Sequence, residues 1–341
     1  MRVGINPEKF DNKLRIVNYH RVVIPVYIPN FEGYFKDSFQ IFKYCLESLL
    51  LTIHAKTRIT IYNNDCHQEI KDYINDQFEK SKFIDQVYHS KENMGKINAI
   101  LAAVKGNLEP LVTITDSDVL FKSGWQEAVE KKFVSFPEAG MVSPVPLSNK
   151  FRNYVSNNWY YGFTKGKIHF QNVIDPDAIA KFNKSLGSGL PPLNEIYLEK
   201  YLVLENKTDK AVMGCGHFVA TLRREVFDKG SNEPAFIKIQ SGVEGKFIDA
   251  PNEKLGYLRI ATLKNYAYHL GNTTEEWMAK EFNLLPTISK ATTRDNKGLY
   301  EGKPLSKNKI FLGKIIKRIV LSKFIIAVYF KSIGLNKSEN Y

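Results

Sequence analysis

Two aspartates, Asp116 and Asp118, carry the clearest chemical signal in the chain, because they directly follow a short apolar segment. Residues 111–115 read Leu-Val-Thr-Ile-Thr, which is typical of a buried strand in a parallel sheet. Carboxylates at the carboxyl end of such a strand lie at the sheet edge where α/β proteins bind ligands. Their oxygens suit Mg²⁺ or Mn²⁺ shared with a diphosphate, so the pattern predicts chemistry on a nucleotide-linked substrate.

A second pair with the same spacing shows that the three-residue pattern alone is not specific. Asp175 and Asp177 flank Pro176, and apolar residues follow at 178–180. Proline suits the first position of a helix, and aspartate suits the N-cap before it. We therefore interpret the second pair as a helix start, and the surrounding sequence has to separate the two cases.

The composition is that of a folded, enzyme-sized protein, with 341 residues of which 43% are hydrophobic and 13% aromatic. Its cysteines, Cys45, Cys66 and Cys215, have no metal-ligand spacing and indicate a reducing compartment without disulfides. The first residues contain no apolar core of a secretion signal. We therefore expect a cytoplasmic protein.

The first 150 residues alternate strand and helix patterns. The strands that we expect cover residues 21–27, 58–62, 85–89, 111–115 and 140–145. The helices that we expect cover residues 38–54, 68–80, 93–105 and 123–136. Such alternation predicts an α/β fold of Rossmann-like type, with a mostly parallel mixed sheet flanked by helices.

Later segments differ in character. Residues 150–210 are rich in Asn, Tyr, Lys and Gly, and we interpret them as an insertion, either a cover over the site or a surface excursion. Residues 211–272 again have strand-like character, and residues 273–305 form a polar connection to a basic tail at 306–341.

Five segments match one family pattern in order along roughly residues 20–272. They are Val23-Ile24-Pro25-Val26-Tyr27, Ile61-Tyr62-Asn63-Asn64-Asp65, Asn93-Met94-Gly95-Lys96 with Asn98-Ala99, Asp116-Ser117-Asp118, and Gly214-Cys215-Gly216-His217-Phe218 with Arg223-Arg224-Glu225-Val226-Phe227. Together they resemble the GT-A-fold, family 2-type glycosyltransferases, which pass a sugar from a nucleotide diphosphate to an acceptor hydroxyl. The resemblance implies a GT-A domain over residues 1–272, with a nucleotide-binding half at about 20–150 and an acceptor half at about 211–272.

The resemblance also implies which residues bind the nucleotide sugar. They are Pro25, Val26, Tyr27, Asn63, Asp65, Lys96, Asp116 and Ser117. Asn63 stands where the family usually has Asp, although its amide still offers partners to a pyrimidine edge. Lys96, at the expected start of a helix, either attracts ribose or phosphate or is simply solvated.

For the metal, the resemblance implies Asp118 as a ligand and Asp116 as a group that holds the ribose or a metal-bound water. His269 resembles the downstream histidine that completes metal coordination in many GT-A enzymes. The alternative for His269 is a packed residue between Tyr268 and Leu270. We expect Mn²⁺ or Mg²⁺ held by Asp116, Asp118 and His269, and imidazole suits Mn²⁺ better.

On the acceptor side, Asp249 stands where the family has its catalytic base, since the usual Glu-Asp appears as Ile248-Asp249. The alternative for Asp249 is a helix cap before Pro251. Gly216 and His217 are expected near the acceptor or donor sugar, with a buried structural histidine as the alternative. The aromatic residues 159–161 fit either stacking on a sugar or core packing.

The tail is basic, because residues 303–341 hold nine Lys and Arg against Glu339 alone in a chain of net charge +12. Its longest uncharged run between residues 309 and 331 has seven residues, too few to span a bilayer. The pattern predicts an amphipathic helix on an anionic membrane surface, and the alternative is a helix packed on the body or in a homodimer. Nucleic acid is not expected as a partner, because the sequence reveals no matching basic face on the body.

We therefore expect a metal-dependent, inverting glycosyltransferase that uses a nucleotide-sugar donor, with UDP as the expected nucleotide. Its acceptor would be a glycan or a lipid-linked glycan in surface polysaccharide synthesis, peripherally on the inner face of the membrane. Two alternatives stay open, a sugar nucleotidyltransferase and a non-catalytic membrane-associated binding protein. The first usually has a Gly-rich loop with Arg or Lys after strand one, which residues 25–30 lack.

Overall fold

The computed structural model describes residues 3–10, 13–187, 194–231, 233–238, 242–286, 299, 301–335 and 341. Three parts of the predictions above lie outside the described residues. They are the Gly- and Pro-rich stretch 188–193 of the expected insertion, residues 287–298 and 300 of the connection, and residues 336–340 of the tail.

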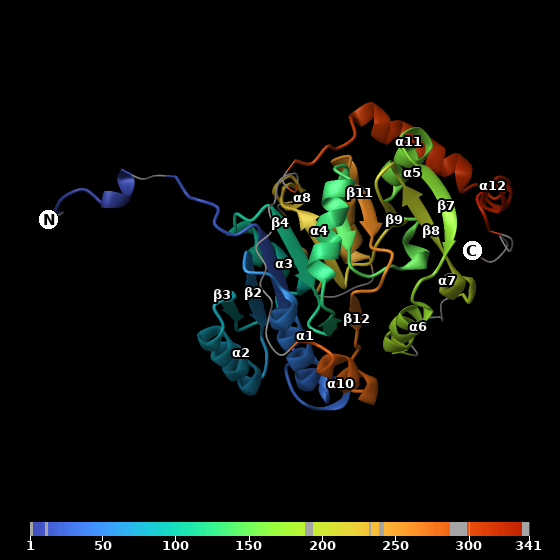
Figure 1. Ribbon diagram of the computed structural model, residues 1–341. Helices are drawn as coiled ribbons and strands as arrows, with labels where there is room; N and C mark the ends of the chain where they lie inside the picture. The colour runs from blue at the N-terminus through green and yellow to red at the C-terminus, as the bar shows by residue number, and fades with distance from the viewer. Residues whose placement is uncertain are drawn as a thin grey trace.

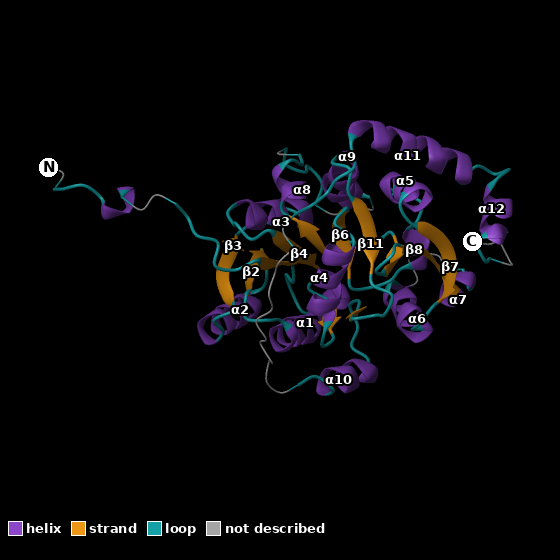
Figure 2. Ribbon diagram, turned by 45° about the horizontal axis from the view of Figure 1, so that its top comes forward, coloured by secondary structure: helices purple, strands orange, loops and turns teal. Residues whose placement is uncertain are grey.

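A ten-stranded sheet runs through the molecule, with helices on both sides of it (Figure 1, Figure 2). Its strand order is β3-β2-β1-β4-β10-β6-β11-β9-β8-β7. The strands are β1 (His20–Val26), β2 (Thr57–Asn64), β3 (Ile84–Ser90), β4 (Leu111–Thr115), β6 (Ala139–Ser143), β7 (Lys167–Asn172), β8 (Lys200–Glu205), β9 (Lys210–Met213), β10 (Val219–Arg223) and β11 (Leu258–Ala261). The predicted α/β fold with a mixed sheet flanked by helices is confirmed.

The helices, in chain order, belong to both halves of the chain. They are α1 (Ser38–Thr52), α2 (Gln68–Lys80), α3 (Lys96–Lys105), α4 (Trp125–Ser135), α5 (Ser156–Thr164), α6 (Pro176–Ser185), α7 (Ile196–Glu199), α8 (Glu225–Asp228), α9 (Ala250–Lys254), α10 (Glu276–Asn283), α11 (Lys307–Val320) and α12 (Ile326–Ser332). The expected helix at residues 68–80 matches α2, and the others of the first half agree within about three residues.

The two halves of the sheet are paired differently. The strands β3, β2, β1 and β4 are parallel to one another, as the alternating pattern predicts. From β4 onward only β6 and β11 are parallel, and the other neighbours are antiparallel. The sheet is therefore less parallel than expected, and β10 is the strand that joins the two halves.

Residues 150–210, expected as an insertion, contribute β7 and β8 to the far end of the central sheet. Two of the three aromatic residues at 159–161 belong to the core, since Trp159 has no exposed surface and Tyr161 keeps only 5%, whereas Tyr160 is half-buried. The alternative of core packing therefore holds for these two, and they do not offer a face to a sugar.

The tail lies against the body, where α11 runs beside α5 in both views (Figure 1, Figure 2). Gly313 is the point of close approach, because a Cβ built on it would lie 2.4 Å from the carbonyl oxygen of Ser156. Ile310 and Val320 are buried on the same side of the helix. None of the described helices is long and apolar enough to cross a bilayer.

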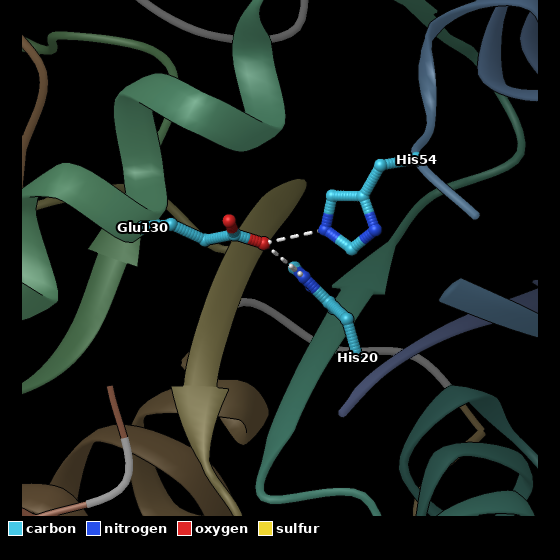
Figure 3. A group of neighbouring side chains, drawn as sticks. All are labelled: His20, His54 and Glu130. Atoms are coloured by element: carbon cyan, nitrogen blue, oxygen red, sulfur yellow. Dashed lines mark hydrogen bonds and ion pairs between the residues drawn. The ribbon is translucent and has the colours of Figure 1, made fainter. Parts of the chain in front are cut away.

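A buried polar cluster joins β1, the chain just beyond the end of α1, and α4 (Figure 3). It lies near the start of β1, where His20 pairs with Leu111, the first residue of β4. Glu130 Oε1 lies 2.8 Å from His54 Nε2 and 3.3 Å from His20 Nδ1. His20 Nε2 lies 2.6 Å from the Thr113 hydroxyl, and the Gln126 amide nitrogen lies 2.7 Å from His20 Nδ1. Because hydrogen bonds already engage both His20 nitrogens, we interpret this cluster as a structural network.

The cluster predicts a specific dependence of stability on pH. Burial by itself raises the pKa of Glu130, but hydrogen bonds from His20 and His54 lower it from 4.5 to about 2. The carboxylate therefore stabilises the fold above pH 4.5, and this contribution is lost as the pH falls toward 2. We expect Glu130→Gln to lose about 2 kcal/mol of unfolding free energy at pH 7 and less at pH 3, measured by urea denaturation.

Glu79→Gln, at an exposed position on α2, is the matched control and should change little at either pH. An equal loss for Glu130→Gln at pH 7 and pH 3 would show that the cluster does not stabilise the fold through the charge of Glu130.

Candidate functional site

The turn of Asp116–Asp118, here called the acid turn, directly follows β4 and is held by backbone hydrogen bonds on both sides. The Asp116 N–H donates to the carbonyl of Phe218 at 2.7 Å, and the Leu270 N–H donates to the carbonyl of Asp118 at 2.7 Å. The strand before it is buried along its whole length. Both carboxylates are therefore fixed at the carboxyl end of β4, as the sequence predicts.

His269 reaches the acid turn through a pair of very short strands that the sequence analysis does not anticipate. β5 (Val119–Phe121) pairs antiparallel with β12 (Ala267–His269), and His269 lies opposite Val119. One oxygen from each of the two aspartates and one nitrogen of His269 lie within 4.8 Å of one another. His269 Nε2 is 3.4 Å from Asp118 Oδ2.

The imidazole of His269 is held in one orientation by the end of α6. The Ser185 hydroxyl donates to the carbonyl of Phe182 at 2.7 Å, so its oxygen accepts from His269 Nδ1–H at 2.8 Å. The lone pair of Nε2 therefore faces Asp118. The rings of Phe182 and Phe218 pack edge-on against the imidazole, with centroids at 5.8 and 5.1 Å.

The second Asp-x-Asp pair positions this same helix. The carboxylate of Asp175 accepts a hydrogen bond from the Ala178 N–H at 3.2 Å, with Pro176 in the first turn. The interpretation as a helix start is thus confirmed. Gly271 lets the chain after His269 approach α6, because a Cβ built on it would lie 2.7 Å from the carbonyl oxygen of Ser185.

The donor set at the acid turn fits a divalent cation. Asp118 Oδ1 is buried and has no hydrogen-bond partner among the described residues, which would be costly without a further ligand. Burial and the nearby Asp116 carboxylate raise the pKa of the Asp118 carboxyl above its usual value, although His269 acts in the opposite direction. Two carboxylates with an imidazole suit Mn²⁺ better than Mg²⁺.

Lys96 points into the site and is not merely solvated. Its ammonium lies 2.5 Å from Asp116 Oδ1 and 3.2 Å from Glu244 Oε1. Burial lowers the pKa of Lys96, but the two carboxylates raise it above its usual value. The lysine is therefore charged and lies beside the aspartate that the sequence assigns to the donor.

The structure corrects the expectation for Asn63. Its side chain has no exposed surface, its amide nitrogen lies 2.7 Å from His89 Nδ1, and its oxygen accepts from the Cys66 N–H at 2.9 Å. The amide is therefore buried among these partners and does not reach the surface where a nucleotide base could bind. Asp65, two residues on, is half-buried and has a left-handed backbone with φ 69°, a conformation that is uncommon for non-glycine residues but that Asp adopts more readily than most.

The other predicted donor residues lie at the same sheet edge with different exposure. Val26 is fully buried, so it can meet a ligand only through its backbone, whereas Pro25 is half-buried and Tyr27 is exposed. The Tyr27 ring packs against Phe35 with centroids 5.7 Å apart. Ser117, between the two aspartates, is half-buried.

Asp249 and His217, predicted separately, lie in direct contact. His217 Nε2 is 2.5 Å from Asp249 Oδ2, and Arg259 Nη2 is 3.0 Å from the same oxygen. Asp249 stands before α9, but its side chain makes no capping hydrogen bond there. Its carboxylate is committed to His217 and Arg259, so the capping alternative is not supported. Gly216, next to His217, is buried.

Four site residues escape the sequence analysis, namely Ser185, Glu244, Arg259 and Tyr34. Partial burial and the carboxylates of Asp118 and Asp116 raise the pKa of Tyr34, which is itself exposed. Only Arg259 leaves a signal in the sequence, because a charged residue inside the apolar run 258–261 needs a buried partner.

No protein-family model and no curated protein sequence matches the chain. Among solved structures it is similar to the mannosyltransferase PcManGT from Pyrobaculum calidifontis, in complex with GDP-Man and Mn²⁺, at 14% identity and a TM-score of 0.43 over 74% of this chain and 56% of that one. It is similar to S. aureus TarS, residues 1–349, at 11% identity and a TM-score of 0.44 over 90% and 73%. It is also similar to GalNAc-T7 with UDP, GalNAc and Mn²⁺, at 14% identity and a TM-score of 0.46 over 74% and 44%.

The chain thus spans 56% of the mannosyltransferase and 44% of GalNAc-T7. At these identities and TM-scores, the similarities carry no argument about the activity of this chain, which has to rest on its own residues.

Because the Ser185 hydroxyl orients His269, we expect that removing this hydroxyl weakens metal binding although all three proposed metal ligands remain. Ser185→Ala frees the imidazole to rotate, and we expect Mn²⁺ to bind about tenfold more weakly, measured by calorimetry. Ser332→Ala is the matched control, since the Ser332 hydroxyl also donates to the carbonyl three residues before it, at 2.7 Å. Equal Mn²⁺ affinity in both variants would contradict the positioning role of Ser185.

Proposed function

We propose that the protein is a metal-dependent glycosyltransferase that moves a sugar from a nucleotide-diphosphate donor to an acceptor hydroxyl. The observation that carries this proposal is the convergence of Asp116, Asp118 and His269 within 4.8 Å at the carboxyl end of β4. Lys96 adds a cation beside these carboxylates. A divalent cation and a lysine at one sheet edge suit a diphosphate, which is the leaving group of such a transfer.

The residues in and around the acid turn have different tasks in this proposal. Asp118 and His269 hold Mn²⁺ or Mg²⁺, and Asp116 holds the ribose or a metal-bound water. The metal, when bound, neutralises charge on the departing diphosphate. Lys96 contacts the donor phosphates, and Asp65 contacts the nucleotide, for which UDP is our choice.

Transfer with inversion requires a base on the face of the sugar opposite the diphosphate. We assign that side of the site to Asp249 with its neighbours Gly216 and His217, since this carboxylate is tied to the site by His217. The acceptor is a glycan or lipid-linked glycan in surface polysaccharide synthesis. Residues 1–272 act as the catalytic domain, with 273–305 as a connection to the tail.

The Asp-x-Asp pairs provide a matched test of the donor site. We expect a UDP- or GDP-sugar with Mn²⁺ to raise the melting temperature, and a ligand at 100 times its Kd adds about 2.7 kcal/mol to the unfolding free energy. Asp118→Ala should abolish this Mn²⁺-dependent stabilisation. Asp177→Ala, at the equivalent place in the helix-capping pair, should retain it.

The reaction product then distinguishes a glycosyltransferase from a nucleotidyltransferase and from a binding protein. A glycosyltransferase releases nucleoside diphosphate only when an acceptor is present or water replaces it. Formation of a nucleotide sugar from a nucleoside triphosphate would identify a nucleotidyltransferase. Stabilisation by the nucleotide sugar without any turnover across an acceptor panel would favour a binding protein.

We further propose that the outer face of α11 and α12 binds an anionic membrane surface. On the side of the tail opposite the buried Ile310 and Val320, exposed apolar side chains form a surface that is here called the lipid face. They are Phe311 (64% exposed), Leu312 (47%), Ile315 (39%), Ile319 (51%), Phe324 (92%) and Val328 (71%). Phe311, Ile315 and Ile319 repeat every four residues and so lie along one side of α11.

Charge supports a lipid partner for this face. Exposed basic residues surround the apolar ones, namely Lys307, Lys314, Arg318, Lys323 and Lys331. No Asp or Glu occurs between residues 302 and 338. Apolar side chains rimmed by basic ones match the chemistry of an interfacial helix on anionic lipid.

Vesicle sedimentation tests the lipid face. We expect the protein to bind phosphatidylglycerol vesicles, and to be released by salt, while Phe311→Ser with Phe324→Ser weakens binding at least about tenfold through lost apolar burial. Leu284→Ser removes an equally exposed apolar residue beyond α10 and should bind normally. If the double variant instead turns a dimer into a monomer, this face joins two copies of the chain and the membrane proposal is wrong.

A further inference from the structure

We propose that His217, and not Asp249, takes the proton from the acceptor hydroxyl, with Asp249 as the positioning residue behind it. This inference rests on the proposed function and changes one assignment within it. The two side chains lie 2.5 Å apart, from His217 Nε2 to Asp249 Oδ2.

Burial argues against direct contact between Asp249 and an acceptor. Asp249 is only 1% exposed, and its Oδ1 is buried without a hydrogen-bond partner among the described residues. Its Oδ2 is shared by His217 and Arg259. The side chain of His217, in contrast, is 25% exposed, so it is the member of the pair that a hydroxyl can reach.

Arg259 fixes the carboxylate from behind. Its guanidinium donates to the carbonyls of Cys215 at 2.7 Å and Asn153 at 2.9 Å, in addition to Asp249. Asp249 ends a π-helical turn over Gly245–Asp249, a rare backbone form that occurs frequently at functional sites. The carboxylate is thus held rigidly toward the imidazole.

This arrangement sets the tautomer of His217. A hydrogen bond from Nε2–H to the Asp249 carboxylate leaves a lone pair on Nδ1, for which the described residues provide no partner. The Asp249 carboxylate therefore stabilises the imidazolium that forms when Nδ1 takes a proton.

His217 is followed by Phe218, which contacts residues that we propose to bind the metal. The Phe218 carbonyl accepts from the Asp116 N–H at 2.7 Å, and its ring packs against His269 with centroids 5.1 Å apart. Phe218 therefore connects the proposed base, His217, with both the acid turn and the imidazole of His269.

The glycosyl transfer needs no reactant other than the donor and the acceptor. The acceptor oxygen forms a bond to the anomeric carbon of the donor sugar while the bond from that carbon to the diphosphate oxygen breaks. The bonding pair leaves with the diphosphate, and the acceptor proton goes to His217 Nδ1. Asp249 keeps its negative charge throughout and stabilises the imidazolium.

Chemical rescue tests the assignment in the full-length protein. We expect His217→Ala to lower kcat by about 10²–10⁴-fold with little change in the KM for donor, and added imidazole to restore part of it. Asp249→Asn should lower kcat as well, since the amide favours the wrong tautomer. His169→Ala is the matched control, because His169 also lies beside a carboxylate, Glu205 at 3.6 Å, but on the far strand β7.

A readout without turnover keeps this inference separate from the proposed function. Nitrogen NMR of His217 should show Nε2 protonated and Nδ1 unprotonated, and Asp249→Asn should disturb that state. Transfer by the wild-type protein together with unchanged kcat in His217→Ala would overturn the assignment. A raised donor KM at normal kcat would overturn it too, because His217 would then only bind sugar. Absence of transfer with every donor would instead overturn the proposed function.

Discussion

The antiparallel pairing of β10 with β4 is the contact on which the rest of the site depends. Its register places Val219 opposite Thr115, so the chain that enters β10 lies beside the chain that leaves β4. His217 and Phe218 thereby meet the acid turn, about 100 residues earlier in sequence. A slip by one residue would move every side chain of β10 to the opposite face.

The same spacing of two aspartates serves two purposes because of what stands next to it. After a buried strand, the carboxylates of the acid turn are followed by β5 and not by a helix, and one oxygen of Asp118 has no hydrogen-bond partner among the described residues. Before a proline and an apolar run, Asp175 caps α6. The helix it starts ends at Ser185, which holds His269. The two pairs thus contribute to one site, one through its carboxylates and the other through a helix.

The features that the sequence predicts correctly are those that depend on residues close together in the chain. The strands of the first half, α2 and the N-cap of α6 follow from apolar periodicity and capping preferences within a few residues. The inward amide of Asn63 does not, because its partner His89 comes from another strand, β3. β5 and β12 have three residues each and gain definition only by pairing across nearly 150 positions. The contact between His217 and Asp249 likewise exists only once β10 and β11 lie in one sheet.

The buried ion pair of Arg259 and Asp249 is hard to explain by stability alone. Both side chains are 2% exposed, and withdrawing two charges from water costs several kcal/mol per ion, about as much as their attraction returns. Apolar residues of similar volume would often serve the fold equally well. The pair leaves the imidazole of His217 as the one accessible group at its end. A base of fixed tautomer requires an anchored carboxylate behind a partly exposed imidazole, whereas a residue that only fills the core requires neither.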